Sequence, residues 1–78
     1  MDYKIEKRIG SNIRILREKS GMTQEVLSAK LQVMGCDITR SALAKMEVAQ
    51  RHIYPDEIMW IKTILNVTYE DIFDQSVF

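Results

Sequence analysis

Apolar residues recur at helical spacing in the first part of the chain. Ile5, Ile9, Ile13 and Leu16 lie four, four and three residues apart, so they share one face of a helix. Gly21 follows at a place where helices commonly end with a left-handed residue. The spacing predicts a helix over about residues 4–20.

Three later segments share one pattern, in which an apolar residue precedes a threonine and a second apolar residue lies four positions after it. A threonine at this place accepts a hydrogen bond from the first helical turn, and the two apolar side chains close over that turn. The three segments are Met22-Thr23 with Leu27, Ile38-Thr39 with Leu43, and Val67-Thr68 with Ile72. They predict helices over about residues 23–34, 39–48 and 68–74.

A further helix start is marked by Pro55, because proline favours the first helical position. Asp56 and Glu57 follow it, where the positive end of the helix dipole favours acids. This helix is predicted over about residues 55–66, with Ile58, Ile61, Ile64 and Leu65 as its inward stripe. The five helices and their short connections predict an all-α, compact five-helix bundle that forms a single domain over residues 1–78.

The composition supports one small core and narrows the class of protein. A hydrophobic fraction of 46% is sufficient for a single core, and no apolar run is long enough to cross a bilayer. No secretory leader is evident, so we expect a cytoplasmic protein. Cys36 is unpaired and is expected to be a packed turn residue rather than a redox sensor. With one Cys and one His, no metal or other cofactor is expected.

The third predicted helix has one side suited to base edges in a major groove. At 100° per residue, Met46 and Glu47 share the inward side of Leu43, whereas Ser41, Lys45 and Val48 point away. Arg40 projects from the helix start, and the small Ala44 on the flank allows close approach of the backbone. Arg and Lys donate to guanine, and Ser donates or accepts. The candidate base-reading residues are therefore Arg40, Ser41, Ala44 and Lys45, although a merely hydrated surface has the same polarity.

Net charge supports this interpretation only weakly. The chain is neutral as a whole, but residues 1–40 carry +3 (eight Lys/Arg against five Asp/Glu) and residues 41–78 carry −3 (three against six).

No carboxylate pair, activated nucleophile, phosphate-binding glycine loop or metal-ligand spacing is present. An enzyme is therefore not expected.

Four segments in order resemble the phage repressor and Cro (XRE) type of helix-turn-helix domain. They are residues 9–17, 21–28, 38–47 and 65–73, so the resemblance covers most of the chain. The second opens with glycine, an apolar residue, threonine and glutamine, and the third ends in the glutamate typical of the family's recognition helix. The resemblance implies a helix-turn-helix that binds duplex DNA, with residues 39–48 as its recognition helix.

The resemblance also implies roles for particular residues. Gln24 is expected to contact phosphate, and Arg17 and Glu47 are expected to form a structural ion pair between the first and third helices. Thr39 at the start of the recognition helix, and Arg51 and His52 in the loop after it, are further phosphate candidates, although an exposed loop histidine without such a contact is equally expected.

Two positions depart from the family pattern. The turn over residues 32–37 is longer than in the shortest members, which leaves room for an extra turn of the second helix or a tilt of the third. Ala49 stands where the family often has glycine after the third helix. Because a left-handed alanine is strained, we expect that connection to be built differently.

The expected function is a sequence-specific transcription regulator, a repressor of bacterial or phage origin, that binds a palindromic operator as a homodimer. No small-molecule ligand and no membrane partner is expected. A dimer has to use the fourth and fifth helices or the C-terminal tail. The candidate patch consists of Trp60, Tyr69, Ile72, Val77 and Phe78, although scattered apolar residues on a surface are also normal. The alternative is a protein-interaction adaptor or antitoxin-like module that has the fold without DNA binding. It draws support from the zero net charge.

Overall fold

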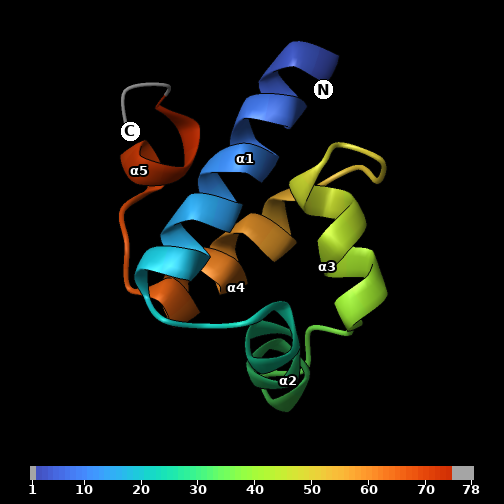
Figure 1. Ribbon diagram of the computed structural model, residues 1–78, viewed down its shortest axis with the longest axis vertical. Helices are drawn as coiled ribbons and strands as arrows, with labels where there is room; N and C mark the ends of the chain where they lie inside the picture. The colour runs from blue at the N-terminus through green and yellow to red at the C-terminus, as the bar shows by residue number, and fades with distance from the viewer. Residues whose placement is uncertain (1, 75–78) are drawn as a thin grey trace.

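The computed structural model describes residues 2–74, and its regular structure consists of five helices (Figure 1). These are α1 (Tyr3–Lys19), α2 (Gln24–Val33), α3 (Arg40–Glu47), α4 (Pro55–Leu65) and α5 (Tyr69–Phe73). The predicted all-α, five-helix architecture is confirmed. No helix in the described part of the chain is long and apolar enough to span a membrane.

Threonine side chains begin three of the helices, as the sequence pattern predicts. The hydroxyls of Thr23, Thr39 and Thr68 accept hydrogen bonds from the N–H groups of the third helical residue, at 3.1, 3.1 and 3.0 Å. These bonds satisfy donors that have no partner within the helix. The threonines thus lie just outside the helices, which accounts for starts one residue later than predicted.

Four of the helices end in the same backbone turn, with a residue of positive φ at the helix cap or directly after it. At the end of α3, for example, the Gln50 N–H donates to the Lys45 carbonyl (2.8 Å) and the Ala49 N–H to the Met46 carbonyl (3.2 Å). This pair of bonds defines a Schellman motif. The residues of positive φ are Gly21, Gly35, Ala49 and Asn66. The expectation that the chain avoids a left-handed Ala49 is wrong: its φ is 61°, because the turn requires it.

Ala49→Gly is expected to raise the free energy of unfolding by up to about 1 kcal/mol. Glycine has no Cβ, so it removes the strain of the left-handed backbone from the folded state. It also raises the conformational entropy of the unfolded chain, but this offsets only part of the gain in stability. Chemical denaturation measures the change. Ala29→Gly in the right-handed, exposed part of α2 is the matched control and should destabilise by about 1 kcal/mol. Equal losses in the two variants would contradict the strain at Ala49.

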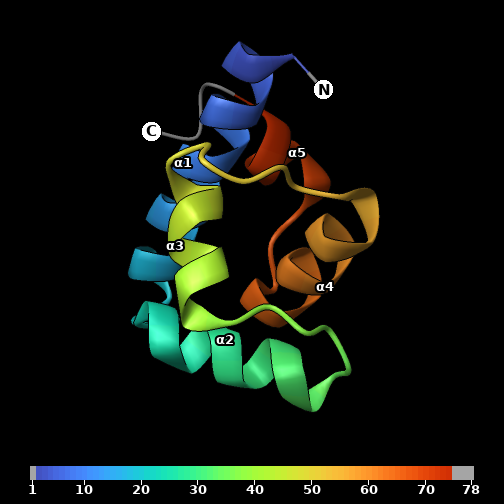
Figure 2. The same cartoon turned by 90° about the vertical axis from the view of Figure 1, so that its right-hand side faces the viewer.

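The central helix of the fold is α1, which packs against α3, α4 and α5. Figure 1 shows α3 and α5 on opposite sides of α1, and Figure 2 shows α2 crossing the foot of α3. The core between them is built from aliphatic side chains with no exposed surface, namely Ile9, Ile13, Leu27, Leu31, Ile38, Leu43, Ile61 and Ile72, together with Met46. Ile5, the first residue of the predicted stripe, lies outside this core and is 39% exposed.

Gly10 allows α1 and the end of α3 to approach closely. A Cβ built on Gly10 would overlap the Met46 carbonyl oxygen and lie 3.1 Å from the Glu47 carbonyl oxygen. Both neighbours are backbone atoms, so a side chain could not be accommodated by a rotamer change. Gly10 was not identified from the sequence; a glycine inside a helix is the signal that could have found it.

Gly10→Ala is expected to destabilise the protein by about 1–3 kcal/mol, because α1 and α3 have to separate. Thermal unfolding followed by circular dichroism measures this loss. Ser11→Ala, one residue further along α1, should change stability little. If both variants melt together with the unmodified protein, the contact between Gly10 and α3 is not as close as described.

Candidate nucleic-acid interface

One side of α3 is exposed to solvent. Arg40, Ser41 and Lys45 are exposed, whereas Ala44 is half-buried. On the opposite side Leu43, Met46 and Glu47 are buried. The base-reading candidates therefore share an accessible surface with two cations, a hydroxyl and a small residue.

Two surface hollows border this side of α3. The first is lined by the capping residue of α3, by residues of α3 and by the loop that follows it: Thr39, Ser41, Ala42, Lys45, Gln50, Arg51, His52 and Tyr54. The second brings Arg40 together with Gln24 and Glu25, at the start of α2, and with the end of α1. Gln50 and Tyr54 were not identified from the sequence, and their position beside Arg51 and His52 is the only signal for them.

A buried ion pair fixes the end of α3 to α1. The Arg17 Nε donates to Glu47 Oε2 at 2.7 Å and its Nη2 to Oε1 at 3.1 Å, with both residues at most 6% exposed. The remaining nitrogen, Nη1, donates to the Met22 carbonyl at 2.8 Å. Gln24 Nε2 also donates to Glu47 Oε1, at 3.0 Å. The pair thus joins α1, the start of α2 and α3, and it holds Gln24 in a defined position.

The start of α3 is held by a second set of bonds from α2. The Ser28 hydroxyl donates to the Ile38 carbonyl at 2.7 Å, and Gln32 Nε2 donates to the same carbonyl at 3.3 Å. Since α2 ends at Val33, the connection to α3 runs over residues 34–39. Cys36 in this turn is 8% exposed, and its burial, with Glu57 and Asp56 nearby, raises the pKa of the thiol. It is a packed turn residue, as predicted.

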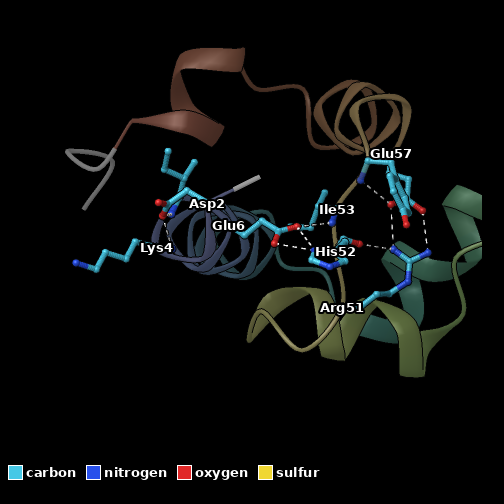
Figure 3. Close-up of polar contacts among 9 residues, drawn as sticks. Asp2, Lys4, Glu6, Arg51, His52, Ile53 and Glu57 are labelled. Atoms are coloured by element: carbon cyan, nitrogen blue, oxygen red, sulfur yellow. Dashed lines mark hydrogen bonds and ion pairs between the residues drawn. The ribbon is translucent and has the colours of Figure 1, made fainter.

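Arg51 is not a free cation in the loop after α3. Its Nη1 and Nη2 donate to the two carboxylate oxygens of Glu57, both at 2.9 Å, and Nη1 also donates to the His52 carbonyl (Figure 3). Burial raises the pKa of Glu57, but the bonds from Arg51 and the Tyr54 N–H outweigh it and leave that pKa below its usual value. The geometry favours Arg51 as a residue that orders the loop.

Glu6 at the start of α1 fixes the other side of this loop. Its carboxylate accepts the Ile53 N–H at 3.0 Å and faces His52 Nδ1 at 3.0 and 3.1 Å (Figure 3). The bond from the Ile53 N–H, followed by that from His52, lowers the pKa of Glu6. Glu6 was not identified from the sequence, although its spacing from Ile9 and Ile13 places it on the buried stripe.

The protein is expected to lose stability as pH falls below about 4.5, the usual carboxyl value. Glu6 and Glu57 have lowered pKa values in the folded state, so the unfolded chain takes up protons first. Their stabilisation is complete above that pH and is lost as pH falls through the folded-state pKa. Melting temperatures from pH 7 to pH 3 test this prediction. A Glu6→Gln variant should show a flatter acid limb, and an unchanged limb would contradict the role of Glu6.

The candidate dimer patch is only partly exposed. Tyr69 is 47% exposed, whereas Trp60 is half-buried and packs on the core. The assignment of Ile72 to this patch is wrong, because Ile72 is fully buried: the apolar residue that follows a capping threonine by four positions faces the core. Val77 and Phe78 lie outside the described residues.

Over residues 2–74, no group of three or more His, Cys, Asp or Glu side chains is placed to hold a metal ion.

Comparison with known proteins agrees with the geometry of the site. Searches of curated proteins and of solved structures found no match. A family model described as helix-turn-helix matches residues 13–72, which is more than half of the chain and includes α2, α3 and the turn between them. The chain therefore belongs to the Cro and phage-repressor (XRE) type of helix-turn-helix family, whose members are DNA-binding regulators.

Proposed function

We propose that this protein is a transcriptional repressor that binds a specific duplex DNA site with α3 in the major groove. The observation that carries the proposal is the exposed side of α3, with Arg40, Ser41 and Lys45, on a helix whose end is held by the buried Arg17–Glu47 pair. A helix held rigidly in this way can place donors against base edges.

The proposed base-reading residues are Arg40, Ser41, Ala44 and Lys45. Gln24 and Thr39 are proposed to contact phosphates on one side of α3, and exposed His52 on the other. Gln50 and Tyr54 join His52 in this role, because they line the same hollow. Arg51 contributes through its pair with Glu57, which shapes the loop, rather than as a free charge.

A single domain of this size makes few base contacts, so we propose that two copies bind a palindromic operator. In such complexes the half-sites lie about one helical turn, or roughly 34 Å, apart. Repression follows where the operator overlaps a promoter.

The salt dependence of binding to duplex DNA tests this function against the adaptor alternative. Phosphate contacts release counterions, so the logarithm of the binding constant should fall linearly with the logarithm of the salt concentration. The adaptor or antitoxin-like alternative is favoured by the zero net charge and by the exposed side chains of Val33, Met59 and Phe73. Absence of duplex binding even at low salt would contradict DNA recognition and favour that alternative.

A further inference from the structure

A mainly apolar groove lies between the start of α4 and α5. It is lined by Pro55, Asp56, Ile58, Met59, Tyr69 and Phe73, and is called the α4–α5 groove below. Met59, Tyr69 and Phe73 are 41%, 47% and 40% exposed, so several large apolar side chains meet solvent at one place. Clustered exposed apolar side chains are characteristic of interaction surfaces.

The charges at this groove are mostly acidic. Asp56 forms part of its wall, and Glu70 lies exposed on α5 beside Tyr69. Asp71 is engaged in capping α5, where it accepts the Thr68 N–H at 3.0 Å. Lys62 is the basic residue nearby, and its Nζ lies 5.2 Å from the centre of the Tyr69 ring. The groove is therefore suited to a segment that combines apolar and basic side chains.

The first two turns of α1 form such a segment. Tyr3 and Ile5 are 62% and 39% exposed, and Lys4 and Lys7 are exposed between and beside them. The acids of the segment are engaged: Asp2 accepts the N–H groups of Lys4 and Ile5, and Glu6 faces the loop after α3. In Figure 3 the Lys4 side chain points away from the body of the protein.

This segment and the groove belong to the same end of the molecule. Asn12 Nδ2 donates to the carbonyls of Ile72 and Asp74, both at 2.7 Å, so this side of α1 faces α5. Ile5 precedes Asn12 by seven residues, or two helical turns, and hence lies on the same side. The residues that line the groove belong to α4 and α5, and none belongs to α3 or to the loop over residues 48–54. A segment bound in the groove therefore leaves the exposed side of α3 free.

We infer that the α4–α5 groove binds residues 3–7 of a second copy of this chain. In a two-fold dimer the segment of each copy binds in the groove of the other. The interface then contains two identical sets of contacts, each with apolar side chains and with oppositely charged side chains. The inference rests on the proposed function in that it supplies the two-fold assembly for a palindromic operator, but assembly itself is measured without DNA.

Charge reversal tests this interface by sedimentation in the absence of DNA. The unmodified protein should show a concentration-dependent dimer that weakens with added salt. The variant Lys4→Glu/Lys7→Glu carries two acidic surfaces, and Asp56→Lys/Glu70→Lys carries two basic ones. Each should be monomeric alone, and an equimolar mixture of the two should form a heterodimer.

Matched controls separate the interface from loss of folding. Circular dichroism checks that each variant is helical, and Met59→Glu within the groove replaces any charge variant that does not fold. Val33→Glu, at an 88% exposed apolar residue on α2, should leave the dimer intact. A monomeric unmodified protein, dimeric charge variants, a mixture that stays monomeric, or a dimer lost in Val33→Glu would each overturn the inference. An intact dimer without DNA binding would instead overturn the proposed function alone.

Discussion

Replacing Arg17 with alanine is expected to lower the free energy of unfolding by about 3–5 kcal/mol. The substitution leaves the Glu47 carboxylate buried at 4% exposure without its cation, and an uncompensated buried charge is costly. It also removes the donor to the Met22 carbonyl. Because small domains have total stabilities of about 5–15 kcal/mol, a large fall in melting temperature should follow. Chemical and thermal unfolding at neutral pH measure it.

Arg14→Ala is the matched control, since Arg14 lies exposed on the same helix. The Arg14→Ala substitution should change the free energy of unfolding by no more than about 0.5 kcal/mol, as for most surface substitutions. An Arg17→Ala variant with the melting curve of the control would refute the pairing of Arg17 with Glu47.

Removing the cations of α3 is expected to abolish most specific DNA binding without affecting the fold. A good bidentate contact to a base contributes about 1–3 kcal/mol of discrimination, so Arg40→Ala and Lys45→Ala should each weaken binding about ten- to hundredfold. Both side chains are exposed and have no ion-pair partner among residues 2–74, so the melting temperature should change little. Titration of a selected duplex followed by fluorescence anisotropy measures the affinity.

Lys30→Ala provides the control for charge alone. Lys30 is exposed near the end of α2, beside Val33 and Ile64 rather than beside α3. Its loss should reduce affinity far less than the loss of either cation on α3. Variants of Arg40 and Lys45 that bind as tightly as the unmodified protein would show that α3 does not read the site.

The helix starts could be predicted from the sequence because their signals are local. A threonine followed four positions later by an apolar residue specifies the cap and the packing of one turn, and the three threonines do cap α2, α3 and α5. The two sides of α3 follow equally from local periodicity, with Leu43 and Glu47 inward and Ser41 and Lys45 outward.

Features that depend on packing between distant segments could not be predicted in the same way. The role of the Glu6 carboxylate depends on its contacts with His52 and Ile53, which lie 46 and 47 residues away in the sequence. Propensity argued against a left-handed Ala49, but the bonds that close α3 outweigh the strain. The ion pair between Arg17 and Glu47 was predicted from the family resemblance and not from the spacing of the two residues.

Selection from a random-sequence duplex library shows whether α3 reads a specific duplex sequence. Purified protein is incubated with the library, and the bound DNA is recovered over several rounds and sequenced. We predict enrichment of one motif as an inverted repeat, with half-sites about 10 base pairs apart between centres. Recovery of no motif, with weak binding even at low salt, would contradict sequence-specific DNA recognition by this protein.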